Sequence, residues 1–254
     1  SCYGLSSVSI TNSVTEIGES AFFDCTGLIN VIIPNSVTEI GRYLFKDCSG
    51  LISVTFSEAI KELEGFVFSG CSNLTSVVLP KGLKKIGVEA FCECSILKSI
   101  VLPDSIKEIK RSAFKGCSSL TSIVIPRGIE SLGEYVFEGC SSLVSITVES
   151  YYPPEVEEGV LLESFKNITV YVPKESVDIY RNSDDWSIGF SIKPIESNND
   201  TVDIHSDRVS NGSLFAQIVS LCEESIIWII IFAFSGIGVF LLAWLVIRNS
   251  KRRR

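Results

Sequence analysis

Seven cysteines recur every 23 residues in this 254-residue chain, and regularly spaced thiols could form disulfides or bind a metal ion. They are Cys2, Cys25, Cys48, Cys71, Cys94, Cys117 and Cys140. If each period is one stacked unit, neighbouring Cα atoms lie about 4.8 Å apart, which is within disulfide range. The Cβ vectors would be parallel, however, which does not suit a disulfide, and cysteines along a line without histidine partners do not suit zinc. We therefore expect buried, reduced thiols that pack as small apolar groups, with no metal site.

Two further cysteines fall outside this period. Cys92 forms a Cys-x-Cys pair with Cys94. The pair lacks a basic or helix-start environment, so it is weak evidence for redox chemistry, and we expect Cys92 to be a spare loop thiol. Cys222 lies just before a long apolar segment. There it could link two chains through an intermolecular disulfide and so support self-association, or it could remain an unpaired thiol.

The residue content argues against catalysis. His205 is the single histidine and lies beyond the repeats, so no Ser/His/Asp or Cys/His triad can form within them. The sequence contains no glycine-rich phosphate loop, and no apolar setting singles out a pair of carboxylates. We expect a protein that is not an enzyme and that needs no cofactor.

A fixed period of this length predicts a solenoid, in which each unit packs only on its neighbours. Aligned on cysteine, the unit reads C-s-x-L-x-S-V-x-I-P-x-s-V-x-x-I-G-x-x-a-F-x-x. The alternation at Val31-x-Ile33 predicts a short strand that Pro34 ends, and Val37 to Gly41 predicts a second one closed by a turn. The residues up to Phe45 and Cys48 read as a single helical or 3₁₀ turn. The fold class is therefore a β-rich solenoid of about seven 23-residue units over residues 1–149.

The strand pattern also predicts which side chains face solvent. With Val31 and Ile33 inward, the residues between and before them point outward. The first outward row is Ser9, Ile32, Thr55, Val78, Val101, Val124 and Thr147, and the second is Ser7, Asn30, Ser53, Ser76, Ser99, Ser122 and Ser145. Contiguous exposed apolar surface often marks a partner site. Such residues also simply suit a pleated surface, and both interpretations stay open.

A membrane anchor is predicted near the C-terminus. Residues 226–247 carry no charge and would span about 33 Å as a helix, enough to cross a bilayer. Five basic residues follow, so we expect a transmembrane helix over 225–247, a cytoplasmic tail at 248–254 and extracellular repeats. Residues 196–224 read as a flexible stalk. The part before the helix holds 17 basic and 30 acidic residues, and this net charge of −13 disfavours nucleic acid as a partner.

Four N-glycosylation sequons begin at Asn73, Asn167, Asn199 and Asn211, and the two in the stalk are the most accessible.

The chain contains no methionine and opens on the cysteine of its first unit, without a polar capping unit before it. Because solenoids need capped ends, we expect further repeats upstream.

The repeat resembles the BspA-like, or Treponema pallidum-type, leucine-rich repeats. Residues 150–195, with Ile168 to Tyr180 and Trp186, look like the family's C-terminal cap. A membrane anchor after the cap is similar to the BspA-like surface proteins of parasitic protists such as trichomonads. The resemblance implies a single-pass plasma-membrane protein that adheres to proteins or glycans on host cells, extracellular matrix or other microbes. An endomembrane recognition or sorting receptor and a passive surface antigen are the alternatives.

Overall fold

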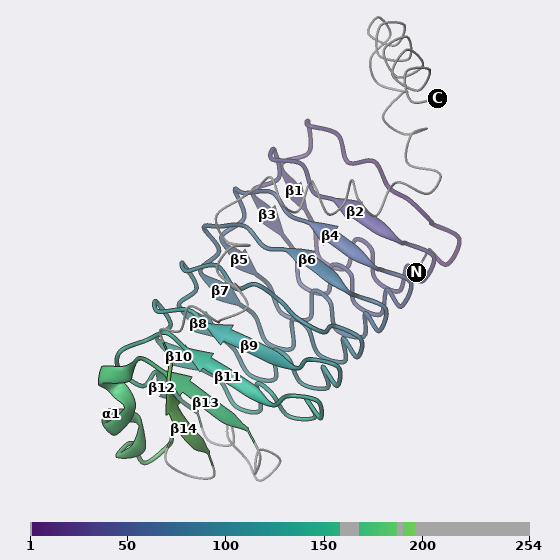
Figure 1. Ribbon diagram of the computed structural model, residues 1–254. Coiled ribbons are helices and arrows are strands. Elements are labelled where there is room, and N and C mark those ends of the chain that lie inside the picture. The colour runs from purple at the N-terminus through teal and green to yellow at the C-terminus, as the bar shows by residue number, and fades with distance from the viewer. Residues whose placement is uncertain (1, 158–167, 187–189, 197–254) are drawn as a thin grey trace, which may run out of the picture. The chain divides into compact units, whose positions relative to one another are not determined.

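A computed structural model describes residues 2–157, 168–186 and 190–196 of the chain. These residues form a solenoid whose short strands lie in two rows along the stack (Figure 1). One row contains β2 (Asn30–Ile32), β4 (Ser53–Thr55), β6 (Ser76–Val78), β9 (Ser122–Ile125), β11 (Ser145–Val148), β13 (Thr169–Val172) and β14 (Ser191–Pro194). The other contains β1 (Glu16–Ile17), β3 (Glu39–Ile40), β5 (Glu62–Leu63), β7 (Lys85–Ile86), β8 (Glu108–Ile109), β10 (Ser131–Leu132) and β12 (Glu155–Val156).

All strand pairs are parallel, and their register reproduces the 23-residue period. Asn30 lies opposite Ser53, which lies opposite Ser76, and Ile86 lies opposite Ile109. Past the seventh unit the offset changes: Ser145 pairs with Thr169, 24 residues on, and Thr169 pairs with Ser191, 22 residues on. The predicted solenoid of 23-residue units is confirmed over the described repeats.

The prediction of two strands in every unit holds for most units but not for all. The first and fifth units keep only their second strand, β1 and β8, and no strand is assigned over Ser99–Val101. The missing strand of the fifth unit separates β6 from β9, and a second break lies between β3 and β5. The strands form four sheets, ordered β2-β4-β6, β9-β11-β13-β14, β1-β3 and β5-β7-β8-β10-β12.

The predicted helical or 3₁₀ turn is wrong, because the third side of each unit is a run of β-turns. We call this third side the turn side. In each of the first six units the turn side contains two residues with left-handed backbone, such as Tyr43 (φ +59°) and Asp47 (φ +59°). A right-handed helix could not contain residues in this conformation. Alternate N–H groups bond to the next unit, as Phe45 N–H does to the Val67 oxygen at 2.9 Å. These bonds between units satisfy the backbone that a helix would have satisfied internally.

Ladders of identical side chains fill the interior. Six phenylalanines stack along the solenoid with ring centroids 5.2 to 6.0 Å apart, namely Phe22, Phe45, Phe68, Phe91, Phe114 and Phe137. The strand residues Val31 and Ile33 are each only 2% exposed, as their alternation predicted. Each unit alone has too little apolar surface to fold, so these ladders hold the units together.

The described residues after 149 extend both rows of strands. They contain β12, the second strand of the seventh unit, and add β13 and β14, together with the 3₁₀ helix η2 (Lys174–Ser176) and the short helix α1 (Val177–Arg181). The Tyr180 hydroxyl donates to the carbonyl oxygens of Ser150 (3.0 Å) and Tyr152 (3.2 Å). Trp186 Nε1 donates to the Pro154 oxygen at 3.2 Å. Both rings are fully buried, so they tie the segment to the end of the repeats.

The predicted stalk (196–224) apart from Glu196, the transmembrane helix and the basic tail lie outside the described residues, as do Cys222 and His205. Within the described ranges, no helix has the length and apolar character that crossing a membrane requires.

Candidate functional site

The outward residues of the sheet row lie where the alternation placed them. We call Ile32, Thr55, Val78, Val101 and Val124 the apolar strip. Ile32 is 72% exposed, Val101 63% and Val78 39%, whereas Val124 is half-buried. Register brings Ile32 opposite Thr55 and Thr55 opposite Val78, so these side chains are neighbours along one face.

A hydroxyl strip runs beside the apolar strip. It consists of Ser53, Ser76, Ser99 and Ser122, with Asn30 before them and Ser145 after them. Ser99 belongs to it by its place in the 23-residue period, since no strand is assigned there. Ser53 Oγ lies 2.7 Å from Asn30 Oδ1, so hydrogen bonds can form between rungs. Ser76, Ser99 and Ser122 are exposed and present their hydroxyl groups to solvent.

The structure extends both strips beyond the residues that the sequence indicated. Thr169 and Ser191 continue the hydroxyl strip, because Ser145 pairs with Thr169, which pairs with Ser191. Tyr171 and Lys193 continue the apolar strip from Thr147 in the same way. Inward and outward side chains alternate in Ile168 to Val172 as they do in the earlier strands. The offset from the preceding strand is 24 residues instead of 23, so counting by 23 does not reach these positions. That offset is the reason that these residues were missed.

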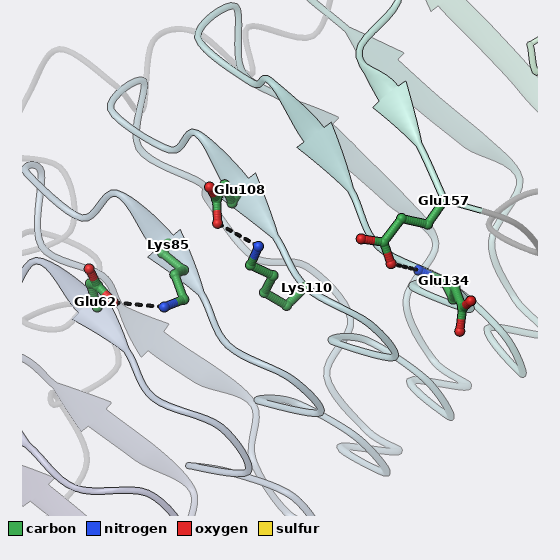
Figure 2. Close-up of polar contacts among 6 residues, drawn as sticks. All are labelled: Glu62, Lys85, Glu108, Lys110, Glu134 and Glu157. Carbon is green, nitrogen blue, oxygen red and sulfur yellow. Dashed lines mark hydrogen bonds and ion pairs between the residues drawn. The ribbon is translucent and has the colours of Figure 1, made fainter.

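From Asn30 to Thr147 neither strip contains a charged residue, although the chain is strongly acidic. Charged side chains instead line the other row of strands, where Figure 2 shows Glu62, Lys85, Glu108 and Lys110. Lys85 Nζ lies 2.9 Å from Glu62, and Lys110 Nζ lies 2.7 Å from Glu108. These contacts raise the pKa of Lys85 and lower that of Glu108. Both pairs are partly exposed, so they contribute little to stability.

Figure 2 also shows the carboxylate of Glu157 accepting a hydrogen bond from the backbone N–H of Glu134 at 3.3 Å. The carboxylate thus binds backbone rather than a cation. Across the described residues, no group of three or more His, Cys, Asp or Glu side chains is arranged to hold a metal ion.

The periodic cysteines make one type of contact that the sequence did not reveal. The thiol of Cys71 donates to the Phe45 oxygen at 3.0 Å, and Cys48, Cys94, Cys117 and Cys140 repeat this contact one unit apart. All described cysteines are free thiols. Burial raises the pKa of Cys48 and of Cys140 to about 12, so these thiols stay protonated at neutral pH.

Cys92 lies in a turn, as expected of a loop thiol, but it is buried. It is 8% exposed, and burial raises its pKa to about 11, so little reactive thiolate forms near neutral pH.

Asn73, the sequon within the repeats, has an exposed side chain. The sequon residues Asn167, Asn199 and Asn211 lie outside the described ranges.

A parallel stack of 23-residue units with an exposed, uncharged sheet face defines a leucine-rich-repeat scaffold. The sequence model of the BspA type leucine rich repeat family matches this chain in six copies, over residues 1–121 and 63–183. The chain therefore belongs to this family. Members of this scaffold family are typically non-enzymatic.

Two solved structures support the assignment. The leucine rich repeat protein TpLRR of T. pallidum is 30% identical, with a TM-score of 0.52, over 71% of this chain and 79% of its own. A leucine-rich repeat protein from Eubacterium ventriosum is 34% identical, with a TM-score of 0.51, over 54% of this chain and 39% of its own. No curated protein matches the sequence.

Proposed function

We propose that the apolar and hydroxyl strips together form a surface that binds proteins or glycans. The observation that supports this proposal is the exposure of Ile32, Val78 and Val101 along one uncharged face of an acidic chain. Soluble proteins rarely leave contiguous apolar surface uncovered, and solenoids commonly bind through their extended faces. Repeated hydroxyl groups beside that surface supply hydrogen bonds at regular intervals.

The cellular setting that we propose is a single-pass protein of the plasma membrane. Residues 226–247 would cross the bilayer, the basic tail would remain cytoplasmic, and the repeats would face outward. The partners are then molecules on host cells, extracellular matrix or other microbes. Each strip offers many weak contacts of the same kind, and many copies on one membrane would increase the total strength through avidity.

The double variant Ile32→Asp/Val101→Asp tests the surface. Both side chains are exposed, so two aspartates should leave the fold intact while they place charge on the apolar strip. We expect adhesion of cells that display the full chain to matrix-coated and cell-coated surfaces to fall at least tenfold. Tyr152→Asp is the matched control, because Tyr152 is 68% exposed but lies off both strips. Unchanged adhesion of the double variant would remove the strips as the site.

Labelling of intact cells tests the setting and separates the alternatives. One epitope tag stands ahead of Ser1 and another after Arg254. Signal from the front tag alone supports the surface protein that we propose. Signal only after permeabilisation would favour an endomembrane receptor. A displayed chain with no affinity for any tested surface would favour a passive antigen.

A further inference from the structure

A second candidate site lies on the turn side of the second and third units. There Tyr43 and Phe66 stack on each other with ring centroids 4.8 Å apart and an interplanar angle of 18°. Both rings are half-buried, so part of the pair reaches solvent. The two residues are equivalent in successive units, and both have left-handed backbone, at φ +59° and +62°. This conformation recurs at the equivalent residue of the neighbouring units, Ser20 and Glu89, so it belongs to the turn side as a whole.

Two cations flank the aromatic pair. Arg42 Cζ lies 5.3 Å from the Tyr43 centroid and 5.7 Å from that of Phe66. Lys46 Nζ lies 5.9 Å from each centroid. Since each cation is nearly equidistant from two stacked rings, it must lie beside the stack rather than over an outer ring face. Among the described residues neither cation forms an ion pair with a carboxylate.

The residues at the equivalent positions on both sides of the pair are not aromatic, so the stack ends at these two rings. The residue equivalent to Tyr43 in the first unit is Ser20, which is exposed and too small to cover the ring. On the other side the equivalent residue is Glu89, and Glu19 occupies the position of Arg42 in the first unit, so a carboxylate lies on each side of the pair. A flat ligand would stack on Tyr43 above the small Ser20, with Arg42 and Lys46 in reach of an acidic group.

We propose that Arg42, Tyr43, Lys46 and Phe66 bind an acidic sugar, a uronic or sialic acid residue within an otherwise neutral glycan. The C–H groups of one sugar face carry partial positive charge and stack on the electron-rich face of an aromatic ring. Arg42 can hold a sugar carboxylate with two hydrogen bonds, and Lys46 adds a second positive charge. Nucleic acids also stack on aromatic rings, but the net charge of −13 disfavours densely charged polymers and tolerates isolated carboxylates.

The chain supplies a matched control for the aromatic residues. Tyr135 is the equivalent residue in the sixth unit and also has left-handed backbone, at φ +57°. Its neighbours at the positions of Arg42 and Lys46 are Glu134 and Glu138, and its neighbour in the preceding unit is Ser112. Asparagine tolerates this backbone conformation, so Tyr43→Asn and Tyr135→Asn should both fold. For the cations, Arg111→Gln is the control, because Arg111 is equivalent to Arg42.

The test uses the full chain in non-ionic detergent and three immobilised probes: sialyllactose, a hyaluronan tetrasaccharide and neutral lactose. We expect the two acidic probes to bind and lactose to bind at least tenfold more weakly. Tyr43→Asn and Arg42→Gln/Lys46→Gln should each weaken acidic-sugar binding at least tenfold, whereas Tyr135→Asn and Arg111→Gln should leave it unchanged. The ratio between the two acidic probes tells which sugar acid is preferred.

Three outcomes would overturn the proposal. The first is that the unmodified chain binds neither acidic probe. The second is that Tyr135→Asn weakens binding as much as Tyr43→Asn. The third is that a 15-nucleotide oligothymidine binds the same residues more tightly than the sugars. Because this site lies on the turn side, the Ile32→Asp/Val101→Asp variant should retain acidic-sugar binding, so the two proposals can fail separately.

Discussion

The thiol of Cys94 both fills space in the core and makes a hydrogen bond. It is fully buried, and it donates to the Phe68 oxygen at 3.2 Å, an oxygen that also accepts the Cys71 N–H at 3.0 Å. The 23-residue spacing predicted burial, which holds for Cys25 to Cys140 but is wrong for Cys2, an exposed residue of the first unit. The parallel side chains predicted free thiols, as the described cysteines are. The hydrogen bond could not be predicted, because it joins residues 26 apart and depends on how the turn side is folded.

Buried thiols set an alkaline limit on stability. The pKa is raised by burial for Cys48, Cys71, Cys92, Cys94, Cys117 and Cys140. A thiol whose pKa is higher in the folded than in the unfolded chain favours folding while it is protonated. That contribution is complete below the unfolded pKa of about 8.5 and is lost as pH rises through the folded pKa.

We therefore expect the free energy of unfolding to fall between about pH 9 and pH 11, by up to about 1.4 kcal/mol per pH unit for each buried thiol. Urea unfolding followed by far-ultraviolet circular dichroism at pH 7, 9 and 10 measures this. Cys92→Ala is the matched variant, since it removes one titrating thiol and should give a smaller slope. A free energy of unfolding that stays constant up to pH 10 would contradict the argument.

At the scale of the element, the phenylalanine ladder couples neighbouring units. Phe91 is fully buried and stacks between Phe68 at 5.2 Å and Phe114 at 5.3 Å. Phe91→Ala should lower the free energy of unfolding by about 3–5 kcal/mol, because the cavity forms where two interfaces meet. Urea unfolding measures the loss. Phe91→Leu, which retains most of the volume, should cost less, and equal losses for the two variants would show that ring stacking rather than volume decides the effect.

The strands could be predicted from the sequence, whereas the turn side could not. Alternation of side chains is a local signal, and it placed Val31 and Ile33 inward and Ile32 outward. The turn side contains Phe66 and Glu89 with left-handed backbone, and neither residue type indicates that conformation. Hydrogen bonds to the next unit stabilise this left-handed conformation, and these bonds form only when the units stack. The rings of Tyr43 and Phe66 stand at equivalent positions 23 residues apart, so the period itself brings them together. The pair was missed because this position is not a repeated landmark: other units carry Ser20, Glu89 and Ser112 there.

At the scale of the whole molecule, the units depend on one another in sequence along the stack. Each described unit contacts its neighbours, so stability is close to a sum of unit terms and interface terms. An end unit lacks one interface, and local opening should therefore begin at the ends. The segment with Tyr180 and Trp186 covers the C-terminal side of the seventh unit, where its hydrogen bonds reach Ser150, Tyr152 and Pro154.

Trp186→Ala tests whether this segment protects the repeats. The variant removes a fully buried ring and its hydrogen bond to the Pro154 oxygen, a loss of about 3–5 kcal/mol for large buried aromatic residues. In hydrogen–deuterium exchange with mass spectrometry, amides of β13 and β14 should lose protection first and those of β11 next. Amides of β5 and β7 should change little, because several interfaces separate them from the altered end. Tyr180→Phe, which removes only the hydroxyl, should give the same order with a smaller effect. Uniform loss of protection along the chain would instead show that the solenoid opens as one cooperative unit.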